Sequence, residues 1–167
     1  ITVAELKKIW EPASQGKIRK WKDVNPTWPD KELRLYGAGA DSGTFDYFTE
    51  AIVGKAKSSR GDYTASEDDN VLVKGVSSDV NALGYIPYSY YESNKASFRA
   101  IAVVNPKGMA VLPSAKTVED GTYAPLSRPL FLYVSEKSFG RPAIREFVEF
   151  YLHNASKLVA ESKYVPL

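Results

Sequence analysis

Hydroxyl residues and glycines gather in one short stretch, GAGADSGT (residues 37–44), between a predicted strand and a predicted helix. At a helix N-terminus the first backbone N–H groups have no acceptor inside the helix, and the helix dipole adds about half a positive charge. Ser42 and Thr44 place hydroxyl donors on either side of Gly43, whose missing side chain allows a close approach. The pattern therefore predicts a site that binds an oxyanion without a lysine.

Other glycine and serine motifs fit this stretch less well. The dinucleotide-binding pattern G-x-G-x-x-G fails because the last glycine comes one residue late. A Walker phosphate loop fails because Gly54-Lys55 is followed by alanine instead of a hydroxyl residue. A serine-hydrolase elbow fails because Ser42 stands fourth in GADSG and His153 is the sole histidine that could act as base. The simplest alternative is a helix cap at Ser42 after a tight glycine turn.

The amino-acid composition limits the kinds of functional site that the chain can contain. A chain of 167 residues with 44% hydrophobic content suits one domain with its own core, and a net charge of +2 gives no reason to expect nucleic-acid binding. The absence of cysteine and the single histidine exclude disulfides and thiolate or histidine-cluster metal sites, so we expect no metal and no cofactor. No apolar run reaches the length of a membrane helix. Because the sequence opens at Ile1 without an initiator methionine, we interpret it as a processed or excised piece of a longer protein.

Hydrophobic periodicity, together with capping residues and prolines that begin or end helices, predicts the elements that position the glycine stretch. Thr2 and Glu5 have capping-box spacing, and Pro12 ends the first helix. The polar stretch 55–70 is expected to be a loop, with Asn70 capping the helix after it. The full prediction is helices over 3–11, 44–53, 71–78, 89–96 and from Pro142 onward, and strands over 32–37, 83–88, 100–104 and 130–134. This alternation predicts an α/β lobe with a mixed β-sheet flanked by helices.

Several stretches resemble the phosphate-binding proteins of bacterial ABC importers, the PstS-type periplasmic binding proteins. The likeness is carried by the turn GKIRKW (16–21), by DSGTFDYFTEAI (41–52) with its S-G-T motif, and by YAPLSRPLFLYV (123–134). The resemblance implies a periplasmic-binding-protein-like fold in which two α/β lobes close over one inorganic phosphate without catalysis. It also implies permease subunits as partners and a periplasmic or cell-surface location.

The resemblance assigns ligand contacts to Ser42, Gly43 and Thr44. Family members often have an arginine a few residues before the motif, but this sequence has none there. Arg60 is our candidate substitute because a guanidinium can pair bidentately with phosphate; the alternative is a solvated loop arginine. Arg34 fits less well because it alternates outward on a strand. The family's proton-accepting aspartate lies in a part that this sequence lacks; Asp41, Asp68 and Asp69 are nearby acids that could instead cap turns or helices.

The resemblance also divides the chain. Residues 1–125 are expected to form the anion-binding lobe, and residues 126–167 the returning strand and C-terminal helices, which belong to the first lobe in complete family members. The helix face that carries Phe147, Val148, Tyr151 and Leu152 would then be bare, and it would fold back, dock another chain or pair with a second copy. Two alternatives stay open for the function: binding of another tetrahedral oxyanion, or an interaction module with a vestigial anion site.

Overall fold

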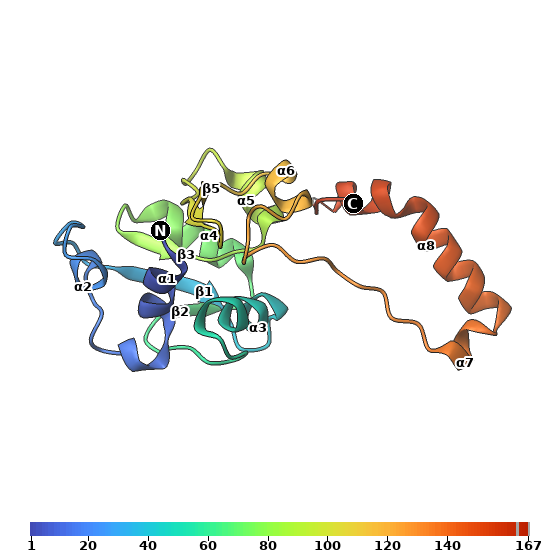
Figure 1. Cartoon of the computed structure of the whole chain (residues 1–167), viewed down its shortest axis with the longest axis horizontal. Helices are drawn as coiled ribbons and strands as arrows, with labels where there is room; N and C mark the ends of the chain where they lie inside the picture. Colours follow the sequence, from blue (N-terminus) through green and yellow to red (C-terminus); the bar gives the residue numbers. More distant parts are fainter. Residues whose placement is uncertain (163, 167) are drawn as a thin grey trace.

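Three parallel strands form the sheet of the lobe, in the order β2-β1-β3 (Figure 1). They are β1 (Arg34–Ala38), β2 (Thr64–Ser66) and β3 (Ala82–Gly84), and Tyr36 pairs with Thr64 on one side and with Gly84 on the other. The computed structural model describes residues 1–162 and 164–166; Lys163 and Leu167, which fall in the predicted segment 126–167, lie outside the described residues. Strands and helices alternate, so the predicted α/β lobe is confirmed.

The first helix, α1 (Val3–Trp10), begins and ends where its sequence signals predict. The Thr2 hydroxyl accepts from the Glu5 amide at 3.1 Å, and the Glu5 carboxylate accepts from the Thr2 amide at 2.8 Å, which completes the capping box. The 3-10 helix η1 (Pro12–Ser14) and the short helix α2 (Trp21–Val24) follow. Because Leu6, Ile9 and Trp10 fall on one face of α1, that face packs into the core.

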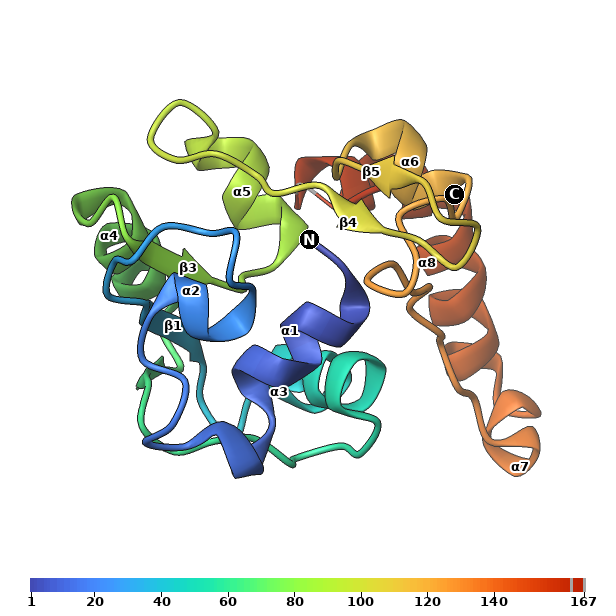
Figure 2. The same ribbon diagram turned by 60° about the vertical axis from the view of Figure 1, so that its left-hand side comes forward.

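The helix after β1 is α3 (Gly43–Phe48), which continues into the π-helical turn η2 (Thr49–Val53). In Figure 2 this helical run lies beside α1, and α1 contacts η2. Aromatic rings seal the core between them: Phe48 stacks on Tyr85 with ring centroids 3.9 Å apart, and Trp10 meets both rings edge-on. The predicted helix over 44–53 is therefore confirmed, and its inner face fixes the position of its N-terminus.

The polar stretch 55–70 is more ordered than predicted, because it contains β2. The next helix, α4 (Asp69–Ser78), is capped by Asp68, whose side chain accepts from the Asn70 amide at 2.9 Å. The predicted cap at Asn70 is wrong, since a carboxylate two residues earlier already meets that amide. Helix α5 (Tyr88–Asn94) follows β3 and confirms the predicted helix.

A second, two-stranded sheet pairs β4 (Val103–Val104) with β5 (Ala110–Val111) in antiparallel fashion. Thr2 adds an isolated parallel bridge to Val104, so the start of the chain lies along this ribbon. Parallel and antiparallel strand pairing, which the prediction placed in one mixed sheet, therefore occur in two separate sheets. Helix α6 (Ala115–Glu119) follows β5.

The C-terminal part leaves the lobe, as Figure 1 shows for α7 (Glu136–Phe139) and α8 (Pro142–Glu161). The predicted strand over 130–134 is wrong: residues 127–135 contain no strand, because no described strand lies alongside to accept their backbone hydrogen bonds. The predicted helix start at Pro142 is confirmed. On α8, Phe147, Tyr151 and Leu152 are exposed and Val148 is buried. Among the described residues, no helix is both long and apolar enough to cross a membrane.

Candidate functional site

The N-terminus of α3 is open to solvent and only partly capped. The Ser42 hydroxyl accepts from the Thr44 amide at 3.1 Å, and the Ser42 carbonyl accepts from the Asp46 amide at 3.2 Å. Within the described part of the chain, neither the Gly43 amide nor the Phe45 amide has an acceptor, and the Thr44 hydroxyl has no hydrogen-bond partner. The predicted cap at Ser42 is therefore present, yet it leaves backbone and hydroxyl donors available at the exposed Gly43.

The three glycines of residues 37–44 lack a side chain for two different structural reasons. A Cβ on Gly37 would come within 2.5 Å of the Tyr85 ring, and a Cβ on Gly39 would come within 2.0 Å of Glu67 Oε1. These two glycines make room for neighbouring side chains of the protein. At Gly43 the nearest atom to such a Cβ is Arg128 Nη2, at 3.9 Å, so this glycine faces open space beside a guanidinium.

Arg128 is a candidate site residue that was not predicted from the sequence. Its guanidinium carbon lies 4.6 Å from the centre of the Tyr47 ring, and no ion pair or hydrogen bond joins it to any of the residues described. The signal was present, because Arg128 stands inside the stretch YAPLSRPLFLYV that carries the resemblance. From the sequence, that stretch was interpreted as a returning strand alone. Arg128 lies close to Gly43 only because the folded chain returns past α3 at this point.

The N-terminus of α3 and the Arg128 guanidinium place two positive charges side by side. A helix N-terminus carries about half a positive charge, and Arg128 adds a full positive charge beside it. Two like charges at this separation repel, and the guanidinium has no carboxylate partner in the described residues. An oxyanion between them would accept from the free amides, the hydroxyls and the guanidinium together.

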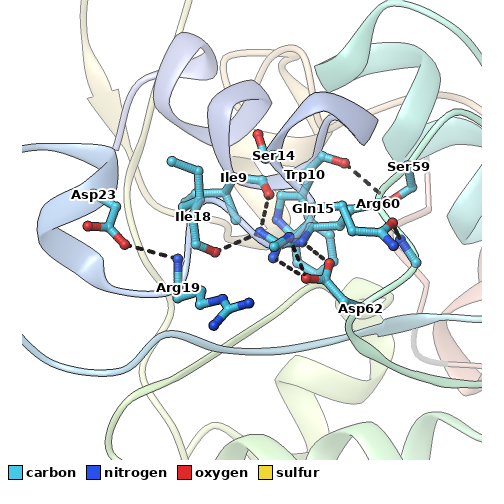
Figure 3. Close-up of polar contacts among 12 residues, drawn as sticks. Ile9, Trp10, Ser14, Gln15, Ile18, Arg19, Asp23, Ser59, Arg60 and Asp62 are labelled. Atoms are coloured by element: carbon cyan, nitrogen blue, oxygen red, sulfur yellow. Dashed lines mark hydrogen bonds and ion pairs between the residues drawn. The ribbon is translucent and has the colours of Figure 1, made fainter.

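Arg60, the predicted guanidinium of the site, is held inside the protein instead (Figure 3). Its Nη1 donates to the carbonyls of Ile9 and Ile18, both at 3.1 Å, while Nε and Nη2 donate to Asp62 at 2.5 and 2.8 Å. Its side chain is 3% exposed, and it joins the end of α1 to the segment before β2. These contacts do not support the expectation that Arg60 binds an anion, because nearly all its donors are used by protein acceptors.

The other charged candidates also have structural partners. Arg34 pairs with Glu32 and Asp79 at 3.1 and 3.2 Å, which holds the start of β1. Asp68 caps α4, and burial together with the neighbouring Asp68 and Glu67 carboxylates raises the pKa of Asp69. Over the described ranges, no group of three His, Cys, Asp or Glu side chains is arranged to hold a metal ion.

Glu67 shapes the loop that leads into the site. Its carboxylate accepts from the Asp41 amide at 3.1 Å and occupies the space that the missing side chain of Gly39 leaves. Behind this loop, the hydroxyls of Tyr63 and Tyr85 both donate to the Ala38 carbonyl, at 3.0 and 3.4 Å. The loop between β1 and α3 is therefore fixed from both sides, which gives the exposed amides a defined direction.

Known proteins are similar to this chain in sequence and in fold. Residues 1–155 match the model of the PBP superfamily domain. The whole chain is 54% identical to Protein SphX of Synechocystis, of which it covers 50%, and 96% of the chain is 38% identical to the phosphate-binding protein PstS of Staphylococcus haemolyticus, of which it covers 49%. The crystal structure of a possible phosphate binding protein from Planctomyces limnophilus matches all of this chain and 59% of that one, at 47% identity and a TM-score of 0.90.

The chain spans about half the length of the curated relatives it matches. The relatives reported above are similar to it in sequence, and the Planctomyces structure is similar in fold as well. The predicted resemblance to PstS-type binding proteins is thereby confirmed. Since the family match extends over 155 of the 167 residues, the chain belongs to the PBP superfamily.

Proposed function

We propose that this chain binds inorganic phosphate as the anion-binding part of the substrate-binding receptor of an ABC phosphate transporter. The observation that carries the proposal is the open N-terminus of α3, where unpaired amides, the Thr44 hydroxyl and the unpaired Arg128 guanidinium meet. The name of the Staphylococcus relative supports phosphate as the anion. The proposed activity is binding without catalysis, with permease subunits as partners outside the cytoplasm.

Each residue of the proposed site has a distinct contribution. The Gly43 and Phe45 amides direct N–H groups at the anion, and the hydroxyls of Ser42 and Thr44 donate from either side of Gly43. Arg128 replaces Arg60 in the proposal, because its guanidinium is exposed beside Gly43 and has no anionic partner in the described structure. Hydrogen bonds to a charged group contribute about 1.5–3 kcal/mol each, more than neutral ones.

This donor set accepts any tetrahedral oxyanion of suitable size. Phosphate differs from sulfate at neutral pH by carrying a proton, and a site selects the protonated anion only if it presents an acceptor. None of the groups named for the proposed site is a carboxylate, the acceptor that would reject a fully deprotonated anion. We therefore expect the chain by itself to discriminate weakly between phosphate and sulfate.

The division of the chain at residue 126 is part of the same proposal. Residues 126–161 are proposed to belong to the other lobe of the receptor, because α7 and α8 lie away from the sheet in Figure 1 and carry exposed aromatic side chains. The relatives are about twice as long as this chain, so their sequences are long enough to contain a second lobe. A second copy of the chain on the same surface is the competing outcome, and the mass in solution distinguishes the two.

Titration calorimetry with phosphate tests the site. We expect saturable binding by the wild type, lost in the double variant Ser42→Ala/Thr44→Val and weakened about 10- to 100-fold in Arg128→Gln, which corresponds to one lost charged hydrogen bond. Arg145→Gln is the matched control, since Arg145 also lies over an aromatic ring, 5.7 Å from the centre of Phe139, but on α8. Absence of phosphate binding by the wild type, or equal loss in both arginine variants, contradicts the proposal.

A further inference from the structure

Tyr47 links the anion-binding helix to the segment that carries Arg128. Its hydroxyl contacts the Pro125 carbonyl and, at 3.1 Å, the Ser127 carbonyl, so it holds the backbone directly before Arg128. Its ring lies under the Arg128 guanidinium, with 4.6 Å from the guanidinium carbon to the ring centre. One side chain therefore contacts both the backbone and the charged group of the arginine segment.

The position of Tyr47 in α3 explains why these contacts bring Arg128 to the site. Tyr47 follows Gly43 by four residues, and residues four apart share one face of a helix. The ring of Tyr47 also points back toward the helix N-terminus, as long side chains on helices do. The guanidinium that lies over this ring also lies beside Gly43, since its Nη2 is 3.9 Å from the position that a Cβ on Gly43 would take.

We propose that Tyr47 is the positioning residue for Arg128, fixing the arginine backbone through its hydroxyl and the guanidinium through its ring so that the charge faces the anion. This inference rests on the proposed function, because it assigns to Tyr47 an effect on phosphate affinity. An exposed arginine has many rotamers, and a support that restricts them reduces the entropy lost when the anion binds. Tyr47 itself acts through Arg128 and not through a contact of its own with the anion.

A double-mutant cycle on phosphate affinity tests the inference. Tyr47→Leu removes both contacts and is expected to weaken phosphate binding about fivefold, the size of one exposed cation–π contact. In the Arg128→Gln background the same substitution is expected to have no further effect, because the group it positions is gone. Tyr47→Phe keeps the aromatic ring and is the substitution least expected to disturb folding. It should retain part of the phosphate affinity that Tyr47→Leu loses.

A second measurement follows Tyr47 without any ligand. Burial raises the pKa of Tyr47, and the nearby Arg128 charge partly opposes that rise. NMR titration of ring-labelled tyrosine is therefore expected to show a higher Tyr47 pKa in Arg128→Gln than in the wild type, and no change in Arg145→Gln. This readout reports the contact between the two side chains even if the chain binds no anion.

The outcomes separate the inference from the function that it deepens. No phosphate binding by the wild type contradicts the proposed function, and with it any role of Tyr47 in affinity. Phosphate binding that Tyr47→Leu leaves unchanged, or weakens equally with and without Arg128, contradicts this inference alone. An unchanged Tyr47 pKa in Arg128→Gln contradicts the contact on which the inference depends.

Discussion

The ion pair between the buried Arg60 and the more exposed Asp62 allows a stability prediction that is independent of any ligand. Asp62→Asn removes the negative charge and leaves the Arg60 guanidinium, 3% exposed, beside a neutral amide. Removing the Asp62 charge is destabilising because the Arg60 guanidinium that remains is buried and stays out of water. We expect the substitution to lower the free energy of unfolding without changing the fold, since an asparagine has almost the same shape.

The magnitude follows from the pKa of Asp62. Hydrogen bonds from Arg60 lower this pKa from 3.8 to about 2. One pKa unit corresponds to about 1.4 kcal/mol, so the shift is equivalent to roughly 2.4 kcal/mol before solvent screening. The Asp62 side chain is 36% exposed, so screening reduces this contribution to about 1–2 kcal/mol.

Urea unfolding at several pH values measures the effect. Because the folded-state pKa of Asp62 is depressed, its stabilising contribution is complete above the unfolded-state pKa and is lost as the pH falls toward about 2. The wild type should therefore exceed Asp62→Asn in stability by about 1–2 kcal/mol at pH 6, and about half of that difference should be gone at pH 3.

Asp30→Asn provides the matched control, because Asp30 pairs with Lys20 and Lys22 on the surface with half of its side chain exposed. Its substitution should cost much less than Asp62→Asn, because exposed ion pairs contribute little to stability. If Asp62→Asn is no more destabilising than Asp30→Asn, or if its effect does not shrink at low pH, the assignment of Arg60 as a buried structural residue is refuted.

Three further substitutions probe the packing around the site, each by urea unfolding. Gly37→Ala places a methyl group against the buried Tyr85 ring and should cost about 1–3 kcal/mol, whereas a neutral result would show that the ring moves freely. Gly39→Ala should displace the Glu67 carboxylate and lose one hydrogen bond, about 1 kcal/mol, and this loss should disappear when Glu67 is already alanine. Thr49→Val removes a buried hydroxyl that accepts a loop amide at 2.8 Å, and a cost below about 1 kcal/mol would contradict its role as that amide's partner.

Local signals in the sequence predicted the parts of the site that depend on neighbouring residues. The cap at Ser42, the start of α3 at Gly43 and the capping box of α1 each involve residues within a few positions of one another. Their energetics are decided by the backbone ends of a single helix. The sequence therefore specified where the open amides lie and which hydroxyls stand beside them.

The charged partner of the site could not be predicted in this way. Arg60 stands in a polar stretch, which suggests exposure, but two carbonyls from the region of α1 and a carboxylate two residues away hold it inside. Arg128 stands just beyond residue 125, at the start of the C-terminal segment, and only the return of the chain past Tyr47 brings it to Gly43. Long-range contacts of this kind leave no periodic pattern in a single sequence.

The predicted strand over 130–134 failed for a related reason. Its residue types favour a strand, but a strand also needs a neighbour that accepts and donates backbone hydrogen bonds. No described strand takes that place, so the residues are extended without pairing. The residue types show that the segment favours a β-strand, but the described structure offers no neighbouring strand with which it could pair.

The same unpaired segment has a practical consequence for handling the chain. Leu130, Phe131 and Tyr133 are 69%, 69% and 87% exposed, in a run without charge that has a high tendency to form β-structure. Such a run is a template for aggregation when many copies meet in solution. Light scattering by the purified chain should therefore grow steeply with protein concentration, and a charged residue in place of Tyr133 should suppress it while leaving the N-terminus of α3 unchanged.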